Sequence, residues 1–130
     1  MRDQFNEAKI KLADGRVAFD CVKLAQIETE GISLVKGRNI PQDCNIVVRT
    51  VNTDYTLTVR GDNIMVRDER RDGRPNRFPE FVSCNIHGST WGGSMLKMNY
   101  IGVGMYLEFH TTDHDTLTTS EIQSLTVKAL

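Results

Sequence analysis

Hydrophobic and polar residues alternate with a period of two along most of this chain, and this pattern limits it to β-strands. In YTLTVR, residues 55–60, Tyr55, Leu57 and Val59 share one face, because successive side chains of a strand point to opposite faces of a sheet. CNIVVRT, FVSCNI and VGMYLEFH alternate in the same way. No segment keeps a helical period of 3.6 residues beyond two turns. We therefore predict an all-β domain of about eight to ten short strands, arranged as a small antiparallel β-barrel or β-sandwich.

Turn-forming residues link these strands into hairpins. Asp14-Gly15 is a strong two-residue turn signal between alternating arms. The segment VNTD, residues 51–54, separates two further strands with polar turn residues. The tail, residues 115–127, is rich in Thr, Ser, Ile and Val, which predicts two short strands with a tight link near Ser120. Residues 22–31 can form one helical turn or prolong a strand, and the pattern does not separate these alternatives.

Length and composition indicate a single domain over residues 1–130, with an N-terminal hairpin and connecting segment at 1–43 and a core β unit at 44–130. The chain is 39% hydrophobic and 25% charged, which is typical of a soluble protein. It has no apolar run near the roughly 18 residues of a membrane-spanning helix, and its start lacks the apolar core of a secretory signal. We expect a cytoplasmic protein with no membrane partner. The net charge of −1 provides no general attraction to nucleic acid or anionic lipid.

The three cysteines, Cys21, Cys44 and Cys84, are scattered and form no C-x-x-C pair. This spacing argues against a disulfide framework and against a zinc site made of thiolates. All three fall on apolar faces of predicted strands, where a thiol behaves as a small hydrophobic group.

An arginine-rich segment, RDERRDGRPNRFPE at residues 67–80, is expected to form an exposed turn between two strands. One interpretation is a solvated loop whose acidic residues partly neutralise the arginines. A second is a site for RNA, a nucleotide or another polyanion, because the guanidinium group matches phosphate oxygens; its residues would be Arg70, Arg71, Arg74 and Arg77. An acidic protein surface is a third possible partner. Phe78 or Phe81 is expected to anchor the segment in the core.

A glycine-rich segment, HGSTWGGSMLKMNYIGVG at residues 87–104, contains the only tryptophan of the chain. Its spacing matches neither a phosphate-binding loop nor the G-x-S-x-G pattern of a hydrolase nucleophile. Glycines allow backbones to approach closely, so we expect a tight, buried connection with Trp91 lying over it as a lid. The alternative is a partner-binding surface, because Trp and Met are enriched at interface cores. Its residues would be Trp91, Met95, Met98 and Tyr100.

Histidines provide two further candidate sites. In HTTDHDT, residues 110–116, His110 is expected to end a strand, whereas Asp113, His114 and Asp115 lie in the turn beyond it. Imidazole and carboxylate suit transition metals, but these side chains need not converge, and His87 is distant in sequence. A polar hairpin tip is the simpler interpretation, and we predict no metal, cofactor or catalytic residue. A hydrolase using Ser94 with His87 or His110 is the remaining alternative.

Several short motifs occur in a fixed order between Val47 and Leu125. They are Arg49-Thr50 with Asn52 and Tyr55, then Phe78-Pro79-Glu80, then Gly88-Ser89, Gly92-Gly93-Ser94 and Leu96-Lys97, and finally Thr119-Ser120 with Ile122 and Ser124. In these motifs the chain resembles a group of small, uncharacterised bacterial all-β proteins that share R-T-x-N-x-x-Y, F-P-E, G-S-x-x-G-G-S-x-L-K and T-S-x-I-x-S patterns. The resemblance implies a small bacterial β domain and transfers no activity. Residues 1–43 lie outside it.

Together these features predict a non-enzymatic protein-interaction or structural β module. We expect it to form a homo-oligomer or to be a subunit of a larger bacterial assembly, because open strand edges and a Gly/Trp/Met surface both favour association. The alternative function is an RNA- or nucleotide-binding β-barrel that uses the arginine-rich segment.

Overall fold

The computed structural model describes residues 26–34, 40–42, 44–61, 63–92, 95–112 and 116–129, together with the strand residues 9–11 and 17–20. The regular elements of this described part are all β-strands, which confirms the predicted all-β class. Six long strands form the main sheet: β6 (Cys44–Thr50), β7 (Thr53–Arg60), β8 (Asn63–Arg70), β9 (Val82–Thr90), β12 (Tyr106–Thr111) and β13 (Leu117–Ala129).

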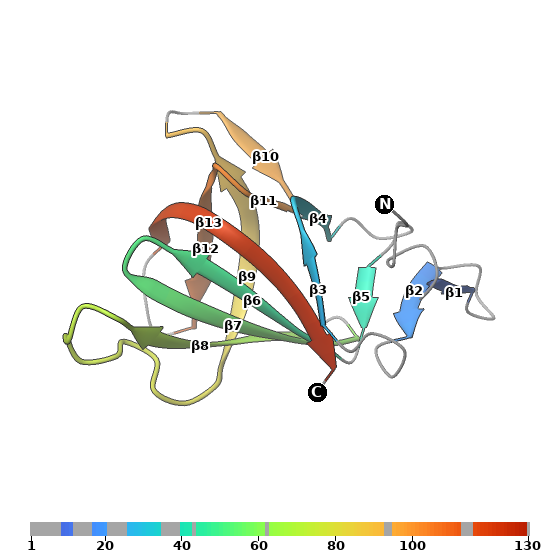
Figure 1. Cartoon of the computed structure of the whole chain (residues 1–130), viewed down its shortest axis with the longest axis horizontal. Coiled ribbons are helices and arrows are strands. Elements are labelled where there is room, and N and C mark those ends of the chain that lie inside the picture. Colours follow the sequence, from blue (N-terminus) through green and yellow to red (C-terminus); the bar gives the residue numbers. More distant parts are fainter. Residues whose placement is uncertain are drawn as a thin grey trace.

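These six strands close into an antiparallel barrel (Figure 1). The hydrogen-bonded order is β9-β12-β13-β6-β7-β8, and β8 pairs back with β9, where Ile64 lies opposite Cys84. Closure settles the choice between the two architectures expected from the sequence in favour of the barrel. A closed sheet leaves no unpaired strand edge within the ring.

Shorter strands are added to the ring of six, and two of them contribute Ile32 and Ile101 to the buried core. They are β3 (Gln26–Thr29), β4 (Gly31–Ser33), β10 (Leu96–Met98) and β11 (Tyr100–Gly102). Strand β3 pairs with β13, β4 pairs with β11, and β10 pairs with β9. Part of the segment before residue 44 therefore joins the sheets of the core unit. Residues 26–29 are extended in β3, so they form no helical turn, whereas residues 22–24, which the pattern could add to the preceding strand, lie outside the described residues.

The N-terminal hairpin expected on either side of Asp14-Gly15 is present as strand pairing. Strand β1 (Lys9–Lys11) pairs antiparallel with β2 (Val17–Asp20), with Lys9 opposite Phe19. The turn itself lies outside the described residues. Strand β2 also pairs in parallel with β5 (Ile40–Gln42).

The barrel core is filled by the residues that the alternation predicted to face inward. Ile46 and Val48 from β6, Leu57 and Val59 from β7, and Leu107 from β12 are almost completely buried. Phe109 is the largest fully buried side chain, and it contacts the ring of Tyr55 edge-on at a centroid distance of 5.9 Å. The ring of Phe78, from the arginine-rich segment, also packs against Phe109, with the two ring centroids 6.1 Å apart. Of the two expected anchors, Phe78 is therefore the buried one.

The C-terminal segment differs from its prediction. Residues 117–129 form one continuous strand, β13, and the expected link near Ser120 is wrong. The strand pairs with β12 through its first half and with β6 through its second, and the register shifts between Ile122 and Ser124. Ser120 and its neighbours include no Gly, Pro or Asn that would break the strand. An irregularity in pairing therefore lets the chain bend from one partner to the other without a turn.

Candidate functional site

Three large apolar side chains on the hairpin of β9 and β10 are each exposed. Trp91 is 69% exposed, Met95 77% and Met98 70%, and we call these residues the apolar arm. The arm lies at one end of the barrel, at the top of the view in Figure 1. Trp91 therefore does not cover the glycines as a lid, and that prediction is wrong: its position at the end of β9 faces solvent. Met95 and Met98 likewise do not contribute apolar cover to the core.

Close backbone contact, the role predicted for the glycines of this segment, is present at Gly88. This residue has φ of +147°, and a Cβ added there would lie 2.1 Å from the main-chain oxygen of Lys97 in β10. Only glycine permits that approach without displacing the neighbouring strand. Gly88 therefore holds β10, and with it Met98, against β9.

Tyr100, the fourth residue predicted for the partner-binding surface, is half-buried. Gly31 and Gly102 leave room for its ring, since a Cβ at Gly31 would lie 1.9 Å from the Tyr100 hydroxyl oxygen. The ammonium group of Lys97 lies 4.0 Å from the ring centroid. Tyr100 thus packs within the protein, against Gly31, Gly102 and Lys97.

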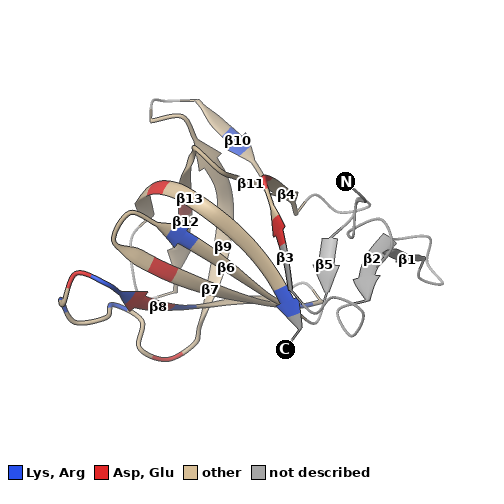
Figure 2. Cartoon of the chain, in the orientation of Figure 1, with Lys and Arg blue, Asp and Glu red and all other residues tan. Residues whose placement is uncertain are grey.

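Charged residues are interleaved over the described surface. In Figure 2 acidic and basic residues alternate along β8 and the loop that follows it, and the remaining charges are dispersed over the barrel. Among the residues that the structure describes, no helix has the length and hydrophobicity needed to cross a membrane.

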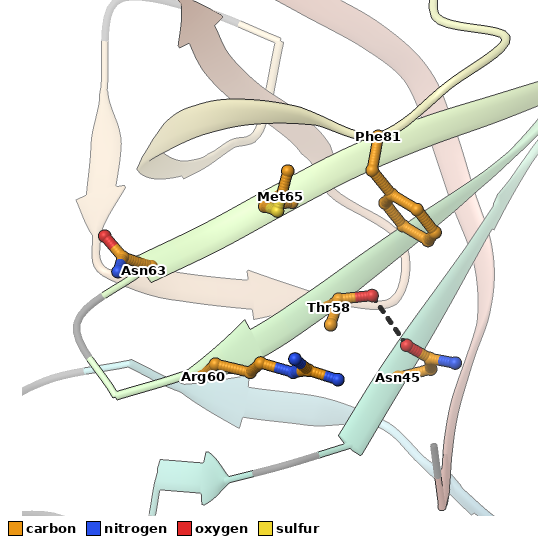
Figure 3. Close-up of a pocket in the computed structure, with 6 residues that line it drawn as sticks. All are labelled: Asn45, Thr58, Arg60, Asn63, Met65 and Phe81. Carbon is orange, nitrogen blue, oxygen red and sulfur yellow. Dashed lines mark hydrogen bonds between the residues drawn. The ribbon is translucent and has the colours of Figure 1, made fainter.

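A groove on the outer wall of the barrel was not anticipated from the sequence. It has a volume of about 410 Å³ and is lined by Asn45, Thr58, Arg60, Asn63, Met65 and Phe81 (Figure 3). The Thr58 hydroxyl donates a hydrogen bond of 2.7 Å to the Asn45 side-chain oxygen. The lining residues come from β6, β7, β8 and the segment before β9, so only the pairing of these strands brings them together. The groove combines an aromatic ring and a thioether with amide and guanidinium groups.

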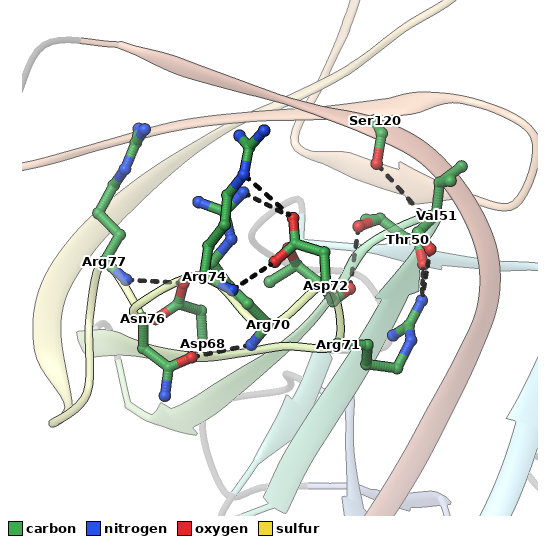
Figure 4. A network of polar contacts seen from close by, with 11 residues as sticks. Thr50, Val51, Asp68, Arg70, Arg71, Asp72, Arg74, Asn76, Arg77 and Ser120 are labelled. Atoms are coloured by element: carbon green, nitrogen blue, oxygen red, sulfur yellow. Dashed lines mark hydrogen bonds and ion pairs between the residues drawn. The ribbon is translucent and has the colours of Figure 1, made fainter.

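A buried carboxylate organises the arginine-rich segment (Figure 4). Asp68 is only 3% exposed, and its two oxygens accept hydrogen bonds from the backbone N–H groups of Arg77, at 3.0 Å, and Phe78, at 2.6 Å. The Asn76 side-chain oxygen accepts a hydrogen bond from the Arg70 N–H at 2.9 Å. These bonds fold the loop back onto β8 and hold Phe78 in the core.

The arginine side chains differ in how firmly they are held. Arg71 forms an ion pair with Asp54 and donates hydrogen bonds to the carbonyl oxygens of Thr50 and Val51, which closes the turn between β6 and β7. Arg70 binds Asp72 at 3.0 Å, and this bond lowers the pKa of the Asp72 carboxyl.

Arg74 and Arg77 are exposed and point to the same side of the loop in Figure 4. Two of the four arginines predicted to bind a polyanion therefore already have carboxylate partners, whereas Arg74 is bound only loosely, with its Nε 3.9 Å from Asp72.

Strand pairing brings together three titratable side chains on the outer wall. The Nδ1 of His87 on β9 lies 3.0 Å from Oε2 of Glu108 on β12, and its Nε2 lies 2.5 Å from Nδ1 of His110. The two imidazole rings are 4.8 Å apart at 55°. His87 and His110 are 23 residues apart in the chain, so their sequence positions alone do not indicate a pair. Both occupy outward positions of alternating strands, and that pattern becomes informative once the two strands are known to be neighbours.

The hydrolase alternative stays a prediction, because its serine is not among the described residues. Ser94, Asp113, His114 and Asp115 lie outside them. Ser89, the serine nearest in sequence to His87, is fully buried, and its hydroxyl donates a hydrogen bond to the carbonyl oxygen of Tyr100 at 2.7 Å. That hydroxyl has a structural role. Among the described residues, no group of three or more His, Cys, Asp and Glu side chains is placed to hold a metal ion.

The cysteines on the barrel strands are expected to resist thiol reagents. Cys44 is buried, and burial raises the pKa of Cys84 to about 12. A raised pKa keeps the thiol protonated, so at pH 8 the reactive thiolate should be about 1,000-fold rarer than for an ordinary cysteine. Iodoacetamide should label the peptides of both residues only after denaturation, as measured by mass spectrometry. Fast labelling of the Cys84 peptide in the folded protein would show that this thiol is accessible and ionised.

Comparison with family models, with curated proteins and with solved structures found no match to this chain.

Proposed function

We propose that this protein is a non-enzymatic protein-interaction module that binds another protein subunit through its apolar arm. The supporting observation is the exposure of Trp91, Met95 and Met98 on one hairpin. A single exposed apolar residue is ordinary, but three large ones on one short hairpin favour a site of association. Tryptophan in particular contributes strongly to binding energy when a partner removes it from water.

The edge of the sheet next to the arm supports the same proposal. Within the described residues, β10 is hydrogen-bonded to β9 along one side only. A strand with an unpaired edge can add a strand from another chain, and the flanking side chains then determine specificity. The six barrel strands are paired into a closed ring, whereas β10 lies beyond it and has an unpaired edge among the described residues. The exposed apolar side chains are on the same hairpin as this edge.

A second copy of this chain is the simplest partner. Trp91→Ala and Met98→Ala are expected to shift the mass measured by light scattering from an oligomer toward the monomer of 14.7 kDa. Both side chains are exposed, so their truncation should leave the circular dichroism and thermal unfolding nearly unchanged. The matched control is Met65→Ala, which removes a methionine that is 37% exposed on the barrel wall. It should leave the measured mass unaltered.

Two results would contradict the proposal. One is unfolding of Trp91→Ala, which would make Trp91 a core residue. The other is the absence of any binding through the arm: the wild-type chain stays monomeric at every concentration, and the immobilised wild-type chain captures the same proteins as the immobilised Trp91→Ala chain. An immobilised wild-type chain that captures a different protein through the arm would support the interaction and identify the partner as another subunit.

A further inference from the structure

Two imidazole nitrogens on neighbouring strands point at each other on the outer wall of the barrel. His87 Nε2 and His110 Nδ1 are 2.5 Å apart, whereas nitrogen donors and acceptors in ordinary hydrogen bonds are usually about 2.9 Å apart. Their strands are paired, with Phe109 opposite Ile86 and His110 opposite Asn85. The register of this pair shifts between Glu108 and Phe109, so His87 has no residue directly opposite it on β12 and is the extra residue of a bulge next to His110.

Glu108 determines which nitrogen of His87 is available. Its Oε2 lies 3.0 Å from His87 Nδ1, and a carboxylate at this position accepts a hydrogen bond from Nδ1–H. The lone pair of neutral His87 is then on Nε2, which is the atom that faces His110. A carboxylate that orients a histidine from behind is the usual arrangement around metal-ligating imidazoles.

From this geometry we propose that His87 and His110 are ligands for one divalent transition-metal ion, with Zn²⁺ as the reference ion and Glu108 as a positioning residue. Imidazole nitrogen suits Zn²⁺, and Zn–N bonds are about 2.0–2.1 Å long. Two such ligands at a tetrahedral angle are about 3.3 Å apart. Reaching that separation requires the rings to part by less than 1 Å, roughly, which side-chain rotation on a surface permits.

The surroundings of the pair allow an ion to bind and to keep other ligands. The side chains of His87 and Glu108 are 25% and 24% exposed, so the site is open to solvent. Since the described residues supply two histidine ligands and no third, water or a group from a partner would complete the coordination. The competing explanation is a direct hydrogen bond between two neutral imidazoles, and this predicts no metal binding.

Calorimetric titration of the full chain with Zn²⁺ tests the proposal. Wild type should bind one ion, and His87→Gln and His110→Gln should each abolish that binding. Glu108→Gln should retain both ligands but bind about 10-fold or more weakly, because loss of an orienting partner typically has that effect. The matched control is His114→Gln, which removes the third histidine of the chain and should bind as wild type does.

Failure of wild type to bind Zn²⁺ would overturn the proposal, as would loss of binding in His114→Gln. A Co²⁺ spectrum with thiolate character would also overturn it, since it would assign the ion to a cysteine. If a histidine variant changes the circular dichroism, NMR of the wild-type imidazoles is the second measurement: Zn²⁺ should shift the signals of His87 and His110 together. Trp91→Ala should bind Zn²⁺ normally, so this test is independent of the proposed interaction.

Discussion

Replacement of Phe109 by alanine is expected to lower the free energy of unfolding by about 3–5 kcal/mol. Phe109 is fully buried at the centre of the barrel and contacts the rings of Tyr55 and Phe78. Truncation removes the largest fully buried side chain and leaves a cavity. To fill it, β12, β7 and the arginine-rich segment would have to move toward one another. Neighbouring barrel strands restrict that movement, so most of the lost packing energy is not recovered.

Chemical denaturation followed by circular dichroism measures this change. The matched control is Phe81→Ala, because Phe81 is 36% exposed and contacts the guanidinium of Arg67 at 5.0 Å on the outer wall. That substitution should cost less than about 1 kcal/mol. Similar losses for the two variants would mean that the core is not centred on Phe109.

Replacement of Asp68 by alanine is expected to cost about 3 kcal/mol. The carboxylate accepts two backbone hydrogen bonds, and the N–H group of buried Phe78 is one of the donors. Hydrogen bonds to a charged acceptor contribute about 1.5–3 kcal/mol each, and a donor left unpaired in the interior adds its desolvation cost. The loop that follows β8 should also open, since Asp68 folds it back onto that strand.

Two measurements follow this effect. The first is the free energy of unfolding, and the second is the rate of trypsin cleavage after the arginines of the loop, which should increase in Asp68→Ala. Asp72→Ala is the matched control in the same loop. It removes an exposed acid whose partners are Arg70 and Arg74, so its effect on stability should be far smaller. Equal cleavage rates in the two variants would argue that Asp68 does not organise the loop.

The alternation of the chain predicted which side of β6, β7, β9 and β12 is buried, and the structure confirms it for these four strands. Leu107 and Phe109 face the core, whereas Glu108 and His110 lie on the outer wall. Prediction was poorer where two alternatives share one local pattern. Phe78 and Phe81 flank the same Pro-Glu pair, and only the bonds from Asp68 to the loop determine that Phe78 is the buried one.

Candidate sites were harder to predict than the strands. The exposed side chains of Trp91, Met95 and Met98 were anticipated as one of two alternatives, while Tyr100 is half-buried over glycines that come partly from another strand. The pair of His87 and His110 was missed, because their contact depends on the pairing of β9 with β12. The groove at Arg60 and Met65 was missed for the same reason.

The amino-acid pattern alone was enough to predict that this chain is built of strands and which side chains of several strands face inward, because a two-residue period is a local property of the backbone. Three outcomes required the folded chain: the closure of the sheet into a barrel, the continuation of β13 past Ser120, and the choice of which outward side chains become neighbours. Those outcomes depend on the register between segments far apart in the chain, which the packing of the whole core selects and no short stretch encodes.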